Sequence, residues 1–284
     1  MKKLIFVFLL YSLSILYSDE LELWSQAAIL IDGETDQILY QKNPNKLVAP
    51  ASMTKVVTLF IVYEYISQGG HKDEYVTVSK NADWRNLPRD SSLMFIEEGQ
   101  SVTLLELMKG LAIPSGNDAA IAIAEHISGS VPAFIEFMNR RVTELGFRSM
   151  KFIDASGFDD NNSITVLEFA QFVAIFYEKY PEAIEELFSL KEFSYPKIKN
   201  GETSIGLVTQ FNHNPMVGYF PGCDGLKTGF IYKSGLNISL SAKRNGRRVY
   251  AVLSGGSTCR SRRKSWKCNF YSKWINLYIS NNSQ

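Results

Sequence analysis

The chain has 284 residues and is 45% hydrophobic, which is enough apolar material for a large core in one domain or in two interlocked lobes. Its formal net charge is +1 and its longest basic run is residues 260–264, so we expect no nucleic-acid partner. The three cysteines are too few and too scattered for a disulfide framework or a zinc site, and we expect neither a metal nor a cofactor.

The N-terminus has the pattern of an export signal. Two lysines follow Met1, and residues 4–17 form an apolar run that is short for a membrane span. We expect residues 1–18 to be a signal peptide and residues 19–284 to act on the periplasmic or cell-wall side of the cytoplasmic membrane. An uncleaved signal would instead give weak membrane association, and that alternative stays open.

The mature chain begins with a predicted hairpin, residues 27–31 and 37–41, followed by a predicted helix at residues 52–69. On this helix Lys55 lies one turn beyond Ser52 and behind its hydroxyl. Burial would lower the pKa of the lysine enough for it to take the serine's proton. Taken alone, the pair is more typical of a capping serine followed by a surface lysine.

A second short motif, Ser115-Gly116-Asn117, falls between two predicted helices, residues 103–113 and 118–127. The glycine permits a tight turn in which the serine hydroxyl and the asparagine amide can point the same way. Ser115 could relay a proton to a leaving amine, and Asn117 could orient Lys55 or hold a substrate backbone. In isolation, Asn117 is more simply interpreted as the cap of the next helix.

The third motif, Lys227-Thr228-Gly229-Phe230, opens a predicted edge strand. The glycine would let a ligand approach the strand closely. Lys227 adds positive potential near the serine, and the Thr228 hydroxyl can bind a carboxylate. The amide of Phe230, together with that of Ser52, forms a candidate oxyanion hole for a tetrahedral intermediate.

A last hairpin, residues 237–244 and 247–254, is predicted around Asn245-Gly246. Residues 189–224 are the least predictable part, and we expect them to form loops around a cleft. The sequence therefore predicts an α+β or α/β fold with one antiparallel sheet built from strands at both ends of the chain, with flanking helices and an inserted helical lobe. The nucleophile is expected where the sheet and the helical lobe join. The expected sheet lobe is about residues 27–50 and 220–284, and the expected helical lobe is about residues 52–200.

Together and in this order, the three motifs resemble those of the D-alanyl-D-alanine carboxypeptidase family. These low-molecular-mass penicillin-binding proteins are serine peptidases of the Ser-x-x-Lys type. The resemblance covers about residues 27–273 and includes the segments around the motifs, residues 50–55, 114–120 and 224–230. It implies a β-lactamase/transpeptidase-like fold, in a short form that lacks the C-terminal β domain of many relatives.

The resemblance implies a serine D,D-carboxypeptidase that removes the terminal D-alanine from peptidoglycan stem pentapeptides through a Ser52 acyl-enzyme. Its partners would then be stem peptides and β-lactam antibiotics, the latter as inhibitors. The family also places an arginine after the last strand to bind the substrate's terminal carboxylate. Arg262 matches that place best, with Arg260 as the second choice.

Three other functions compete with this one. A D,D-endopeptidase would use the same residues on peptidoglycan cross-links. A catalytically idle wall-binding protein would keep the fold but would be free to lose the motifs, which are intact here. A serine β-lactamase needs a fast deacylating base, and the only acidic residue in a roughly suitable place, Glu168, is expected on a helix surface.

The histidines are not expected to form a triad with Ser52, and only His213 is expected near the cleft. Cys223 lies shortly before the third motif and is expected to be an oxidisable thiol near the site. Cys259 and Cys268 could form a bridge, although nothing in the pattern requires one.

Overall fold

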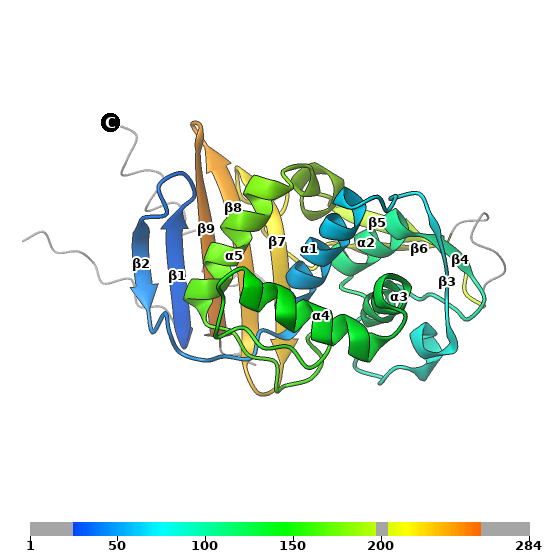
Figure 1. Ribbon diagram of the computed structural model, residues 1–284. Coiled ribbons are helices and arrows are strands. Elements are labelled where there is room, and N and C mark those ends of the chain that lie inside the picture. The colour runs from blue at the N-terminus through cyan, green and yellow to red at the C-terminus, as the bar shows by residue number, and fades with distance from the viewer. Residues whose placement is uncertain (1–24, 197–203, 257–284) are drawn as a thin grey trace, which may run out of the picture.

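The computed structural model describes residues 25–196 and 204–256. Its centre is a five-stranded antiparallel sheet with the strand order β2-β1-β9-β8-β7 (Figure 1). Strand β1 pairs with β9, with Ala27 opposite Ser254, so the prediction of one sheet built from both ends of the chain is confirmed. The strands are β1 (Ala27–Asp32), β2 (Ile38–Lys42), β7 (Cys223–Ile231), β8 (Gly235–Arg244) and β9 (Arg247–Gly256).

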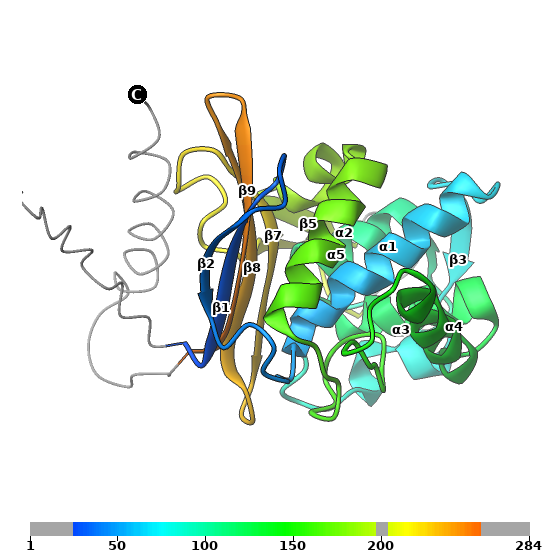
Figure 2. The same ribbon diagram turned by 60° about the vertical axis from the view of Figure 1, so that its left-hand side comes forward.

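Helices cover one face of this sheet and extend beyond its β7 edge (Figures 1 and 2). Helix α5 packs against β1 and β9, while a short turn that leads into α1 packs against β7. The three helices predicted between residues 52 and 127 are confirmed to within two residues at each end. The α-helices are α1 (Thr54–Ser67), α2 (Leu104–Ala112), α3 (Asn117–Ser128), α4 (Val131–Glu144) and α5 (Val166–Lys179). Shorter 3-10 turns lie at Ala51–Met53, Lys80–Ala82 and Trp84–Asn86, and a π-helical turn lies at Ile184–Phe188.

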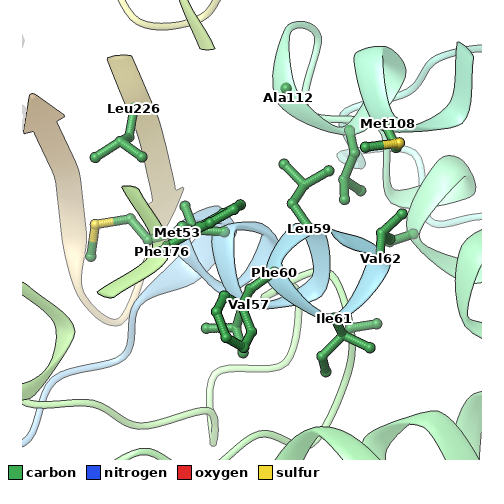
Figure 3. Close-up of a cluster of buried hydrophobic side chains, with 14 of the residues drawn as sticks. Met53, Val57, Leu59, Phe60, Ile61, Val62, Met108, Ala112, Phe176 and Leu226 are labelled. Carbon is green, nitrogen blue, oxygen red and sulfur yellow. The ribbon is translucent and has the colours of Figure 1, made fainter. Parts of the chain in front are cut away.

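Helix α1 runs through the core, and its burial determines how firmly the site is held. Every residue from Thr54 to Glu64 is buried, so the helix is covered on all its faces instead of being amphipathic. Phe60 makes edge-to-face contacts with Phe172 and Phe176 of α5, at centroid distances of 5.1 and 5.5 Å. Figure 3 shows the surrounding apolar side chains, and those that it labels come from the turn Ala51–Met53 and from α1, α2, α5 and β7. A helix packed in this way gives the residues at its start a fixed position.

The prediction of loops over residues 189–224 is wrong in part, because a small hairpin lies there. Strand β5 (Glu192–Tyr195) pairs with β6 (Val208–Phe211), and the hydroxyls of Ser194 and Thr209 lie 2.8 Å apart across it. Each strand has only four residues, and residues 196–207 separate the two strands in the sequence, so the alternation is too short to be detected there. A second small sheet pairs β3 (Tyr75–Thr77) with β4 (Ser101–Thr103).

In the part of the chain that the structure describes, no helix is both long and apolar enough to cross a membrane. The expected signal peptide, residues 1–18, lies outside the described residues. So do Cys259 and Cys268.

Candidate active site

Ser52 lies in the 3-10 turn Ala51–Met53, immediately before α1. The edge strand β7 crosses this turn at very short range. A Cβ added at Gly229 would lie 2.8 Å from the amide nitrogen of Ser52 and 2.9 Å from the carbonyl oxygen of Pro50. The glycine lets the backbone of the nucleophile segment approach β7 this closely. It also lines a cavity at Ser52, so close approach of a ligand to the strand stays a prediction. Glycine is required here for the strand and the turn to meet.

Lys55 is completely buried on the first turn of α1, and its ammonium nitrogen has three acceptors around it. Nζ donates to Ser52 Oγ at 3.0 Å, to Asn117 Oδ1 at 2.7 Å and to the Ser156 carbonyl at 2.6 Å. Burial lowers the pKa of Lys55 to about 7, and the negative charges of Asp154 and Asp118 oppose that shift. The lysine can therefore lose its proton near neutral pH.

This set of partners leaves one direction for the lone pair of a neutral Lys55. A neutral amine has two N–H groups and one lone pair. Asn117 Oδ1 and the Ser156 carbonyl can only accept, so they take the two N–H groups. The lone pair then faces Ser52 Oγ, whose hydroxyl proton it can accept.

The second motif forms the turn between α2 and α3, as predicted. Ser115 has a φ of 67°, a left-handed conformation that is unusual for a serine. Gly116 occupies the cap position and Asn117 is the first helical residue, so the interpretation of Asn117 as a cap is wrong. Its side chain reaches Lys55 instead. Among the described residues the buried Ser115 hydroxyl has no hydrogen-bond partner, and Ser115 lines the same cavity as Ser52.

Asp118 was not singled out in the sequence, yet it fixes this turn. Its carboxylate is fully buried and accepts hydrogen bonds from the amides of Met94, Phe95 and Ile96 at 2.7 to 3.2 Å. The backbone amide of Asn117 donates to the Ser92 carbonyl at 2.8 Å, so the neighbouring segment also holds Asn117. In the sequence, the only sign of this role was an aspartate next to the motif asparagine. That position does not reveal hydrogen-bond partners that lie more than twenty residues away along the chain.

The third motif lies on β7, which is the edge strand of the sheet, as predicted. Lys227 is buried, and its Nζ lies 3.3 Å from the Thr228 carbonyl. Burial and the neighbouring charge of Lys55 lower the pKa of Lys227. Thr228, Gly229 and Phe230 line the cavity that contains Ser52.

Ser52 lies at the junction of two cavities. One, of about 340 Å³, is lined by Ser115, His213 and Thr228 among others. The other, of about 740 Å³, is lined by Asn117, Phe230 and the turn that follows Asp154. A peptide could therefore extend to both sides of the serine.

His213 lies at the cavity, and the prediction that it is near the cleft is confirmed. Its side chain is exposed at the rim. The surrounding protein still removes part of the water from the imidazole, and this desolvation lowers its pKa. The positive charges of Lys227 and Lys55 lower it further. His126 contacts Glu74 at 3.1 Å and lines neither cavity at Ser52.

Two further expectations can be compared with the structure. The Glu168 carboxylate accepts hydrogen bonds from the amide and hydroxyl of Ser149 at 2.8 and 2.6 Å and lines neither cavity at Ser52. It is therefore no deacylating base for a β-lactamase. Burial raises the pKa of the Cys223 thiol to about 11, which makes it less reactive than expected for an oxidisable thiol.

Arg262 and Arg260, the candidates for binding a terminal carboxylate, lie outside the described residues. Over residues 25–196 and 204–256, no group of three histidine, cysteine or acidic side chains could hold a metal ion. The chemistry that the described residues support is nucleophilic attack by a serine with a lysine as base.

The chain is similar to known proteins over most of its length. A family model described as D-alanyl-D-alanine carboxypeptidase matches residues 16–258. The chain is 34% identical over 246 residues to D-alanyl-D-alanine carboxypeptidase DacF of Bacillus subtilis, covering 86% of this chain and 61% of the relative. It is also 34% identical over 244 residues to DacA of Haemophilus influenzae, covering 85% of this chain and 59% of the relative. The chain thus spans about three fifths of the length of these curated relatives.

Solved structures share the fold. Penicillin-binding protein 5 from Haemophilus influenzae superposes with a TM-score of 0.80 at 31% identity, over 91% of this chain and 72% of that one. The prediction of a fold of this type, with mixed helices and an antiparallel sheet, is confirmed.

Proposed function

Because the chain belongs to the D-alanyl-D-alanine carboxypeptidase family, we propose that it is a serine D,D-carboxypeptidase. It removes the terminal D-alanine from peptidoglycan stem pentapeptides through an acyl-enzyme on Ser52. One observation carries the assignment of the nucleophile and the base. The buried Lys55 Nζ lies 3.0 Å from Ser52 Oγ, and its other two partners can only accept hydrogen bonds.

In acylation, neutral Lys55 takes the proton of the Ser52 hydroxyl as Oγ attacks the carbonyl carbon between the two terminal D-alanines. The new Oγ–C bond gives a tetrahedral oxyanion. The amides of Ser52 and Phe230 stabilise this oxyanion, and the close approach of Gly229 to Ser52 supports their pairing. Preorganised donors of this kind lower the barrier because they need not move as charge develops.

Collapse of the intermediate breaks the C–N bond and releases D-alanine. The leaving nitrogen receives the proton held by Lys55, through the Ser115 hydroxyl, which lines the same cavity as Ser52. Water then attacks the acyl carbon, Lys55 accepts its proton, and Ser52 Oγ is re-protonated as the acid leaves. The reaction consumes one water and needs no cofactor.

The substrate's polar groups would meet the second and third motifs. Asn117 holds Lys55 in place and lines the larger cavity. Thr228 binds the substrate's terminal carboxylate together with Arg262. An anion bound here would also oppose the lowering of the Lys227 pKa, because an opposite charge favours the ammonium form.

We further propose that β-lactams acylate Ser52. The name of the Haemophilus influenzae relative states that it binds penicillin, and it shares this fold at 31% identity. The named relatives are bacterial proteins, and we propose that residues 19–284 form one peptidase domain exported by a signal peptide at residues 1–18, to the periplasmic or cell-wall side of the membrane.

The test is mass spectrometry of the purified protein with a pentapeptide ending in D-Ala-D-Ala and with a cross-linked muropeptide dimer, alongside labelling by a fluorescent penicillin. We expect the pentapeptide to lose one alanine, the dimer to stay intact and Ser52 to be labelled. The Ser52→Ala variant should lose both labelling and cleavage, by more than about a thousandfold. Splitting of the dimer would make the enzyme an endopeptidase. Labelling with neither peptide cleaved would favour a wall-binding role.

A further inference from the structure

Asp154 closes the turn that follows α4 and lies next to the site. Its Oδ1 accepts the amide of Ser156 at 2.7 Å and that of Gly157 at 2.5 Å. Its Oδ2 accepts the amide of Asp159 at 2.5 Å. One partly buried carboxylate thus accepts hydrogen bonds from three backbone amides and holds the turn in shape.

The turn made in this way contacts the catalytic segment at three points. The Ser156 carbonyl accepts a hydrogen bond from Lys55 Nζ at 2.6 Å. The Ala155 carbonyl accepts one from the hydroxyl of Thr58, one turn further along α1, at 2.7 Å. Gly157, with φ 81°, lies so close to Ala51 that an added Cβ would meet the Ala51 carbonyl oxygen at 1.8 Å. Asp154 therefore acts on Lys55 through the turn, without touching Ser52.

The charge of Asp154 also bears on Lys55. Burial is the largest influence on the pKa of Lys55 and lowers it, and Asp154 is the stronger of two acidic groups that raise it. The other is Asp118, whose buried carboxylate is already bound by backbone amides. Two basic groups also interact electrostatically with Lys55, namely Lys227 on β7 and His213 at the cavity.

We propose that Asp154 is a positioning residue that sets the lower pH limit of Ser52 acylation. It fixes the Ser156 carbonyl on Lys55, and its negative charge keeps Lys55 protonated to a higher pH than the buried site alone would. This inference rests on the proposed function in one respect, namely that Lys55 is the base. Asp154 and Ser156 were not assigned roles from the sequence, because the contact with Lys55 is made by a backbone carbonyl.

The experiment is the pH dependence of the second-order rate of Ser52 acylation by a fluorescent penicillin, between pH 5 and pH 9. We expect the wild-type rate to rise with pH to a plateau, with a midpoint near 7. Asp154→Asn keeps the size and one acceptor oxygen but removes the charge. Its midpoint should fall by about half a pH unit or more. The ratio of its rate at pH 6 to its plateau rate should therefore be about two- to threefold higher than the same ratio in the wild type.

The matched control is Asp160→Asn, which removes the same charge from an exposed position in the same turn, where its carboxylate lies 3.9 Å from Lys233. Its midpoint should stay at the wild-type value. Asp154→Thr, which also keeps an acceptor oxygen without the charge, gives a second neutral variant if Asp154→Asn does not fold. A lower plateau with an unchanged midpoint in the neutral variants would overturn the proposal. An equal shift in Asp160→Asn would also overturn it, since net charge would then explain the effect.

A titration that needs no substrate separates this proposal from the proposed function. In protein labelled with ¹³C at the lysine ε-carbon, the Lys55 signal is assigned by its loss in Lys55→Arg. Its midpoint should be lower in Asp154→Asn than in the wild type, and equal midpoints would contradict the proposal. If the wild type is not labelled by penicillin, the proposed function fails, while this titration still decides the role of Asp154.

Discussion

Gly229 and Ser52 touch through their backbones, with 2.8 Å between the Ser52 amide nitrogen and the position that a Cβ on Gly229 would take. The edge strand and the nucleophile turn come from segments far apart in the chain. Their contact brings the amide of the nucleophile next to the amides of β7. The proposed oxyanion hole, shared between two such segments, would therefore depend on this one glycine.

The Gly229→Ala variant tests this contact. The added methyl group cannot fit unless the strand or the turn moves, so the two amides should lose their alignment. We expect the rate of Ser52 acylation by a fluorescent penicillin to fall about a hundredfold, while circular dichroism stays unchanged. Gly206→Ala is the control, because an added Cβ there meets nothing within 4 Å, and it should keep the wild-type rate. Wild-type acylation in Gly229→Ala would show that the contact is not needed.

Asn117→Asp tests the environment of the base. The side chain keeps its shape but places a negative charge on the acceptor that lies 2.7 Å from Lys55 Nζ. An opposite charge at this distance favours the ammonium form, so the pKa of Lys55 should rise above its present value of about 7. The pH at which acylation reaches half its plateau should then rise by about one unit or more, and activity at pH 7 should fall.

The control for that variant is Asn45→Asp, the same change at an exposed loop position. Its acylation profile should match that of the wild type. If the Asn117→Asp profile kept its midpoint and only its plateau fell, then Asn117 would act on the substrate and not on Lys55.

Arg262→Ala tests the carboxylate site proposed after the last strand. Loss of a charged hydrogen bond to the terminal carboxylate should lower kcat/KM for a free-acid peptide about tenfold to a hundredfold. The C-terminally amidated peptide should be affected much less. Arg260→Ala is the comparison, since Arg260 is the alternative residue. Equal losses on both peptides in Arg262→Ala would mean that the carboxylate binds elsewhere.

Substitution of Glu64 tests how strongly its ion pairs hold the C-terminal part of α1 against α4 and α5. Its buried carboxylate accepts hydrogen bonds from Arg141 and Lys179, all at 2.8 Å. Glu64→Ala should lower the free energy of unfolding by about 3 kcal/mol in urea denaturation, because the three charge-assisted hydrogen bonds to a buried carboxylate are lost. Glu144→Ala removes an exposed partner of Arg141, 3.2 Å away, and should cost less than about 1 kcal/mol. Equal losses would contradict a special role for the buried carboxylate.

The ion pairs of Glu64 with Arg141 and Lys179 also predict how the free energy of unfolding depends on pH. Burial alone would raise the pKa of Glu64, but Arg141 and Lys179 outweigh it, so the folded protein holds this pKa below its usual value. The stabilisation is therefore present above the unfolded pKa of Glu64 and is lost as pH falls through the folded pKa. Between neutral and acidic pH, the wild type should lose more unfolding free energy than Glu64→Ala does.

Local patterns in the sequence determined the start of the site. The spacing of Ser52 and Lys55 places them one helical turn apart wherever a helix begins, and the apolar residues that follow at helical spacing predicted the helix itself. The terminal hairpins were predicted from alternation and from Asn245-Gly246, since strand and turn signals act over a few residues. The three motifs in order also indicated the family.

Only the tertiary structure decided what surrounds Lys55. Asn117 is 62 residues away and Ser156 is 101 residues away, and the second contact is made by a backbone carbonyl that any residue would carry. For the same reason the sequence did not reveal what Gly229 touches, or the roles of Asp118 and Asp154. Side-chain patterns report on neighbours along the chain, whereas the pKa of a buried lysine depends on every charge and acceptor that folding places around it.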